Sequence, residues 1–251
     1  MTIPLSLMVH FKDRYRIFYS ENDSDLLDTI IQYLDHGIRS IETAFRTRVD
    51  ILFLNVILCP SRTVFDRFVR LFTRVPTDRR RIGQPQSHDI YILSPKCYKD
   101  DAPSYARDES PFYDVKEFKH NLVHELVHVW EELSSPRQAM DIRPGWFSEG
   151  LAMYISESYT EREFKVRLKD DYEKGTVPLP EEMTGEKAYT WGCILFEFLI
   201  RRFGVQKILS IITDTCEEDI ISLLDTDSES MRKEFIEFAK GRIDNNAAAR
   251  R

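Results

Sequence analysis

The hydrophobic periodicity changes part-way along the chain, and this change constrains the fold more than any other feature of the sequence. Up to about residue 95, short apolar runs at 5–11, 14–19, 51–58 and 89–93 have the length and residue types of strands. Helical spacing separates them at 23–46, where Asp23 or Ser24 is the predicted N-cap, and from 61 to about 72. Beyond the loop-like stretch 95–111 the spacing is helical almost to the end, at 114–133, 145–158, 161–172, 185–203, 205–213 and 228–240. The predicted class is α+β, with a small mixed N-terminal sheet, flanking helices and a mainly helical C-terminal lobe.

These patterns predict one domain over residues 1–244, with an N-terminal α/β lobe at 1–95 and a helical lobe at 112–240. The polar, proline-containing stretch 95–111 is expected to be a loop that crosses between the lobes. The arginine-rich segment around 74–85, with Pro76, Gly83 and Pro85, is also expected to be a loop. The small, basic stretch 245–251 is expected to be a flexible tail.

The net charge and the cysteines indicate which kinds of partner and which cellular compartment to expect. The net charge is −7, which does not favour binding to nucleic acid or to an anionic membrane surface. The four cysteines are scattered and form no CxxC pair, so free thiols in a reducing compartment are expected. The N-terminus has no signal-peptide pattern, so a cytoplasmic protein is expected. The oligomeric state is left open by the sequence.

Residues 124–128 read His-Glu-Leu-Val-His, the HExxH pattern that binds zinc when it lies on a helix. An apolar stripe through the motif predicts that helix: Val115, Phe118, Leu122, Leu126, Val129 and Leu133. His124 and His128 then lie one turn apart on one face, where both imidazoles can bind a single ion. Glu125 is rotated by about 100° from His124, toward the open side of the metal. It is therefore predicted to be the general base that acts on zinc-bound water.

A third ligand is expected from a second apolar helix, in which Glu149 follows His128 after twenty intervening residues. Pro144 and Gly145 predict the turn that folds this helix back on the first. The large apolar neighbours of Glu149 would make its burial costly without a metal or a cation. The predicted site therefore holds one Zn²⁺ per chain through His124, His128 and Glu149, with water in the fourth position. The alternative for Glu149 is a surface position on an amphipathic helix.

Together, His124-Glu125-x-x-His128 and Trp146-Phe147-x-Glu149-Gly150-Leu151-Ala152 resemble the gluzincin group of zinc metallopeptidases, in the MA-like superfamily that includes thermolysin-like enzymes. Ala188-Tyr189-x-x-Gly192, ahead of an apolar helix ending at Phe203-Gly204, is similar to a third block of small MA-like peptidase domains. The resemblance covers residues 112–204. It implies a zincin-like active-site cleft between the two lobes and a peptide or protein substrate extended along the edge strand of the sheet.

The resemblance also suggests positions for the edge strand and for a further catalytic group. The candidate edge strand is 89–93, the last strand before the zinc helix. Tyr189 would donate a hydrogen bond to the oxyanion on the attacked carbonyl, although a core tyrosine explains this residue equally well. Trp191 and Gly192 are expected to be packing residues. Thermolysin-like enzymes place an acid that orients a ligand histidine four residues after the glutamate, where this chain has Met153, so such partners must come from elsewhere.

The predicted function is that of a zinc metallopeptidase, a hydrolase in which Glu125 assists the attack of zinc-bound water on a peptide bond. The same groups would serve a zinc hydrolase acting on a non-peptide amide or an ester. A catalytically silent, metallopeptidase-like binding or regulatory protein is a further alternative, although His124, Glu125, His128 and Glu149 are all present. A purely structural zinc site is disfavoured, because such sites close the fourth position with cysteine or histidine.

Overall fold

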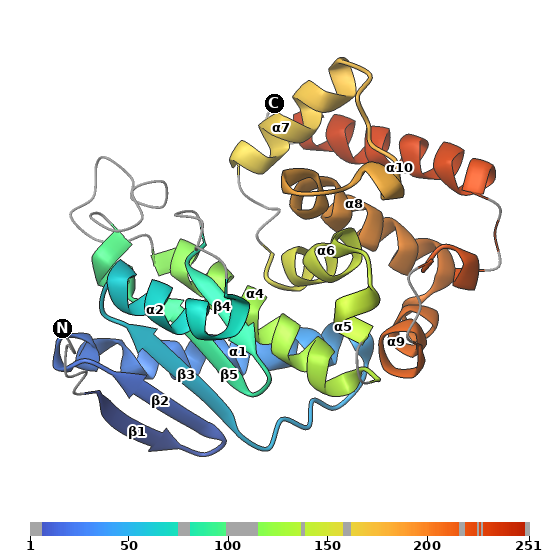
Figure 1. Cartoon of the computed structure of the whole chain (residues 1–251). Coiled ribbons are helices and arrows are strands. Elements are labelled where there is room, and N and C mark those ends of the chain that lie inside the picture. Colours follow the sequence, from blue (N-terminus) through green and yellow to red (C-terminus); the bar gives the residue numbers. More distant parts are fainter. Residues whose placement is uncertain are drawn as a thin grey trace. The chain divides into compact units, whose positions relative to one another are not determined.

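The computed structural model describes residues 7–74, 81–98, 115–136, 139–157, 162–215, 219–224, 226 and 228–248 (Figure 1). The strands are β1 (Met8–Lys12), β2 (Tyr15–Tyr19), β3 (Leu54–Cys59), β4 (Gly83–Gln86) and β5 (Asp89–Leu93). The helices are α1 (Leu27–Phe45), α2 (Arg62–Thr73), α4 (Val115–Ser134), α5 (Ala139–Ile142), α6 (Gly145–Ile155), α7 (Arg162–Glu173), α8 (Glu186–Phe203), α9 (Val205–Asp214) and α10 (Ser228–Ala248). The predicted α+β class, with a helical C-terminal part, is confirmed.

The chain divides into two compact units. The first comprises Met1–Thr43 and Thr47–Leu133, and therefore holds the sheet, α2 and nearly all of α1 and α4. The second comprises Ala44–Arg46 and Ser134–Arg251, and holds α5 to α10. The predicted loop 95–111 lies almost wholly outside the described residues. No helix among the described residues is long and apolar enough to cross a membrane.

The five strands form one mixed sheet in the order β1-β2-β3-β5-β4. β2, β3 and β5 are parallel, whereas β1 and β4 pair antiparallel with β2 and β5. The edge beyond β5 is therefore β4, and the prediction that residues 89–93 form the edge strand is wrong. β4 has the sequence Gly-Gln-Pro-Gln, and it was expected to be part of a loop because it contains Gly83 and Pro85. These residues form a strand because they pair with β5. Proline is tolerated in an edge strand, since the backbone groups on the outer side of such a strand need no partner strand.

Helices cover both faces of the sheet. The hydroxyl of Tyr15 on β2 donates to Asp35 on α1 at 2.6 Å, which assigns that side chain to the face under α1. Tyr91 on β5 points to the opposite face, where its ring contacts Phe68 and Phe72 of α2 with centroids 5.2 and 5.1 Å apart. α1 and α2 thus shield opposite faces, and the apolar side chains of β3 between them are buried.

The helix α4 packs against α1 at a glycine. A Cβ atom at Gly37 would lie 2.7 Å from Leu126 Cδ2 and 3.2 Å from Val123 Cγ1. Leu126 belongs to the HExxH segment, so the small residue on α1 lets the motif helix approach closely. Phe118, Leu122 and Val129 of α4 are also fully buried. This apolar stripe fixes the rotation of α4 about its axis, and with it the direction of the histidines.

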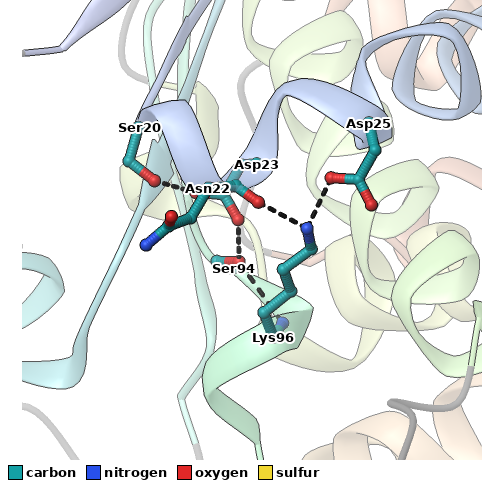
Figure 2. Close-up of polar contacts among 6 residues, drawn as sticks. All are labelled: Ser20, Asn22, Asp23, Asp25, Ser94 and Lys96. Carbon is teal, nitrogen blue, oxygen red and sulfur yellow. Dashed lines mark hydrogen bonds and ion pairs between the residues drawn. The ribbon is translucent and has the colours of Figure 1, made fainter.

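A buried carboxylate joins the ends of β2 and β5 (Figure 2). Asp23 is 2% exposed and accepts hydrogen bonds from the hydroxyls of Ser20 at 2.6 Å and Ser94 at 2.7 Å. The Lys96 ammonium group beside it bonds the Asn22 carbonyl and the Asp25 carboxylate, and its hydrogen bond lowers the pKa of Asp25. Asp23 or Ser24 was the predicted N-cap of α1, yet that helix begins at Leu27 after a short 3₁₀ turn, Glu21–Leu26. The Asp23 side chain instead accepts a hydrogen bond from Ser94, which is 71 residues away in the sequence.

In the second unit α6 and α8 meet backbone to backbone. A Cβ atom at Gly150 would lie 2.4 Å from the Gly192 carbonyl oxygen, and one at Gly192 would lie 2.6 Å from the Trp146 carbonyl oxygen. Two glycines therefore permit this close contact, and Gly192 is a packing residue as expected. Trp191 is fully buried and donates its indole N–H to Asp171 at 2.9 Å, which confirms its packing role.

The last helix is longer than predicted. α10 continues to Ala248, eight residues past the predicted end at 240 and into the stretch 245–251 that was expected to be a tail. The final residues of the helix are alanines, which have the highest intrinsic helix propensity. Residues 249–251 lie outside the described part of the chain.

Candidate metal centre

The two histidines of the motif lie one turn apart on α4, and they present the same ring nitrogen to each other. His124 Nε2 and His128 Nε2 are 3.1 Å apart, and the ring planes are inclined at 81°. Two imidazoles bound to one tetrahedral zinc at about 2.0–2.1 Å would have nitrogens roughly 3.3 Å apart. The observed separation is within a few tenths of an ångström of this value, so the pair suits a shared ion without rearrangement of α4.

Glu149 lies in the second turn of α6 and is half-buried. Its Oε1 accepts a hydrogen bond of 3.0 Å from the hydroxyl of Tyr189 on α8. Tyr189 itself is 40% exposed, so the alternative of a core tyrosine is wrong. The glycine contact between α6 and α8 holds the two helices at the separation this hydrogen bond needs. The tyrosine hydroxyl therefore lies directly beside a candidate ligand oxygen.

The ligand atoms of His124, His128 and Glu149 all lie within 4.8 Å of one another, so these three side chains form a group that could hold a metal ion. Two imidazole nitrogens and one carboxylate are the donor set of many catalytic zinc sites, in which the fourth position stays open. The same set of donors also suits iron(II). The chemistry of the donors thus fits the predicted zinc ion.

The predicted general base lies against the edge strand. Glu125 is only 9% exposed. A Cβ atom at Gly83, the first residue of β4, would lie 2.2 Å from Glu125 Oε1 and 2.6 Å from both Cδ and Cγ. Only glycine leaves room for the glutamate side chain at this position. Gly83 pairs with Ile92 of β5, whose side chain lies on the same face of the sheet as α1.

A second acid of α4 holds the far end of the same hairpin. Glu132 lies two turns after Glu125, and its carboxylate accepts hydrogen bonds from the backbone N–H of Ser87 at 3.1 Å and from its hydroxyl at 3.4 Å. Ser87 is in the turn between β4 and β5 and has a positive φ of 52°. The strand β4 thus lies close to Glu125 at its first residue and is hydrogen-bonded to Glu132 at the turn that follows it, so it runs along the face of α4 that carries the candidate base.

No protein-family model matches the chain, and none of the curated proteins matches it either. The gluzincin resemblance therefore stays a prediction, based on the three sequence blocks that suggested it.

Two residues beside the centre were not identified from the sequence. Gly83 matters because the Glu125 side chain lies against it, and the local sequence around Gly83 does not reveal that contact. Glu131 is fully buried, and its Oε2 lies 3.9 Å from Nδ1 of His128. Its spacing of three residues from the second histidine of the motif was a visible signal, because residues at i and i+3 share a helix face.

Proposed function

We propose that the chain is a zinc-dependent metallopeptidase in which His124, His128 and Glu149 hold one zinc ion and Glu125 is the general base. The observation that carries the proposal is the convergence of two imidazoles and a carboxylate within 4.8 Å, with a further carboxylate next to the first imidazole in the sequence. A metal held in this way supplies Lewis acidity, which polarises a substrate carbonyl and acidifies a neighbouring water.

The role proposed for Glu125 is proton transfer. Its carboxylate takes a proton from the attacking water as the new carbon–oxygen bond forms, and it returns that proton to the amine nitrogen as the carbon–nitrogen bond breaks. The base ends the reaction in its starting form, and one water is consumed for each bond cut. Catalysis of this kind contributes about 10²- to 10⁴-fold in rate. Burial beside Gly83 supports this role, because a carboxylate held on one side by backbone has few alternative orientations.

A peptide substrate is favoured by the position of β4. This strand ends the sheet, and its first residue contacts the candidate base. An extended peptide can add to such an edge through backbone hydrogen bonds, which recognise the main chain whatever its side chains. A peptide placed there would have its carbonyl groups next to Glu125. An ester or an isolated amide would gain little from a strand edge.

Tyr189 is proposed to donate a hydrogen bond during the reaction. Its hydroxyl donates a hydrogen bond to Glu149 Oε1, and a rotation of the phenol about its side-chain torsions would release the hydroxyl toward substrate. One such donor directed at a developing oxyanion contributes about 10²- to 10³-fold in rate. A change of Tyr189 to Phe is therefore expected to lower kcat with zinc retained.

The test is metal analysis of the purified protein together with cleavage of a quenched fluorescent peptide library. We expect about one zinc per chain in the wild type and in Glu125→Gln, with cleavage lost only in the variant. His128→Ala and Glu149→Ala are expected to lose both zinc and cleavage. His10→Ala, which changes a histidine on β1 outside the group, serves as the matched control and should keep both.

Three outcomes would contradict the proposal. A wild-type protein that neither contains nor takes up zinc would exclude the metal site. Iron in place of zinc would change the chemistry to that of an iron(II) centre. Stoichiometric zinc with no peptide or protein cut, or with cleavage of a non-peptide amide or ester instead, would exclude the peptidase.

A further inference from the structure

Glu131 is a charged side chain with no exposed surface, one helical turn after His128 on α4. An ionised carboxylate in such a setting is expensive to bury unless other groups compensate for the lost water. Its Oε2 lies 3.9 Å from Nδ1 of the His128 imidazole. The buried acid is therefore next to a candidate metal ligand.

Two other buried acids of this chain have partners that compensate for the loss of water around the carboxylate. Asp23 accepts two serine hydroxyls, from Ser20 and Ser94. Glu197 on α8, which is 5% exposed, pairs with Arg201 at 2.8 Å and Arg242 at 2.9 Å. Both have direct structural explanations within the fold. Glu131 differs because it lies beside a group with a proposed function, the imidazole of His128.

The two ring nitrogens of His128 face different neighbours. Its Nε2 is directed at His124 Nε2, the side on which an ion shared by both rings would lie. Its Nδ1 lies 3.9 Å from Oε2 of the Glu131 carboxylate. A histidine that binds a metal through Nε2 must carry its proton on Nδ1, and the hydrogen bond made by that proton sets both the tautomer and the ring orientation.

We propose that Glu131 is the positioning residue of His128: its carboxylate accepts the Nδ1–H hydrogen bond and so keeps Nε2 unprotonated and directed at the metal. This inference rests on the metal site of the proposed function and assigns a partner that the sequence left unassigned. The distance of 3.9 Å is about 1 Å longer than a hydrogen bond. Rotation about the terminal torsion of Glu131, which is soft for a carboxylate, can close that gap when the ring carries the added charge of a bound ion.

The test measures zinc affinity by competition with a chromophoric chelator, beside the thermal midpoint of each protein. Glu131→Leu removes the acceptor and should weaken zinc binding by about 10- to 100-fold. Glu131→Gln keeps a neutral acceptor of the same size, and we expect an affinity between those of wild type and Glu131→Leu. Glu197→Gln is the matched control, since it alters another buried carboxylate and should lower the thermal midpoint with zinc affinity unchanged.

An independent measurement needs no variant. In the zinc-loaded wild type, the Nδ1–H proton of His128 should give a downfield NMR signal that exchanges slowly with water, as expected for a buried hydrogen bond. If Glu131→Leu does not fold, this signal and the zinc affinity of Glu131→Gln test the positioning role of Glu131.

The outcomes separate this inference from the proposed function. Zinc affinities within threefold of wild type for the folded Glu131 variants would overturn the positioning role alone. A Glu197→Gln variant that loses as much affinity as Glu131→Gln would also overturn it, because the loss would then report general destabilisation. A wild-type protein that does not bind zinc would overturn both proposals.

Discussion

Replacement of Gly83 by alanine is expected to disable the candidate base without touching a metal ligand. The added Cβ atom would lie 2.2 Å from Glu125 Oε1 and 2.6 Å from Cδ and Cγ, about 1 Å inside normal contact. Three atoms of the side chain overlap with it, so rotation of the carboxylate alone cannot relieve the clash. Glu125 must turn away from β4. The expected loss of kcat is that of a general base, about 10²- to 10⁴-fold, or roughly 3–5 kcal/mol in the barrier.

The assay combines peptide cleavage, zinc content and chemical denaturation in a double-mutant cycle. The overlap should lower the free energy of unfolding of Gly83→Ala by about 1–3 kcal/mol. In a Glu125→Ala background the space is already free, so the second change should cost neither stability nor further activity. Gly241→Ala is the control, because a Cβ atom there meets nothing within 4 Å. This helical glycine lies in α10, and its replacement should raise stability by about 0.5–1 kcal/mol.

Two results would refute the reasoning. Gly83→Ala could keep its activity within threefold of wild type while Glu125→Ala loses it, which would mean that the side chain at position 83 does not displace the base. Alternatively, the losses could add in the double variant, which would mean that Gly83 acts through something other than Glu125.

Three further predictions concern the scaffold. Gly192→Ala should lower the free energy of unfolding in urea by about 1–3 kcal/mol, because its Cβ would lie 2.6 Å from the Trp146 carbonyl oxygen, which belongs to helix backbone. Asp23→Ala should lower it by about 1–3 kcal/mol, because the buried Ser94 hydroxyl loses its acceptor, and an unchanged urea midpoint would contradict this. Burial, with the charge of Asp89, raises the pKa of Tyr91 to about 12. This tyrosine therefore contributes stability that is fully present below about pH 10 and is lost as the pH rises through about 12. Tyrosinate absorbance can follow the ionisation.

The elements that the sequence predicted correctly are those whose signal is local. The apolar stripe around the HExxH motif predicted α4 to within one residue at each end, because the spacing is sustained over the whole helix. β5 matches its predicted range, since a short apolar run with two isoleucines and a tyrosine is typical of a strand whatever it pairs with. The same applies to His124 and His128, whose relation to each other follows from helix geometry alone.

Features that depend on distant residues were missed. β4 reads Gly-Gln-Pro-Gln, a sequence that favours a loop, and it is a strand because it pairs with β5. Asp23 or Ser24 was predicted to cap α1, but the Asp23 carboxylate accepts a hydrogen bond from a serine 71 residues away instead. The spacing of Glu131 from His128 was visible, whereas its complete burial was not. Each of these features depends on residues that are distant in the sequence and close in space, and a single sequence does not reveal such contacts.

The two edges of the sheet differ in a way that matters for handling the protein. β4 is only four residues long, contains Pro85 and is held by Glu132 at the following turn, so it offers another chain only a short stretch of backbone to pair with. The opposite edge, β1, is five residues long and has three large apolar side chains at least 38% exposed, Met8, Val9 and Phe11. Aggregation at high concentration is therefore expected to begin at β1. A lysine in place of Val9 should improve solubility there, far along the sheet from the strand that contacts Glu125.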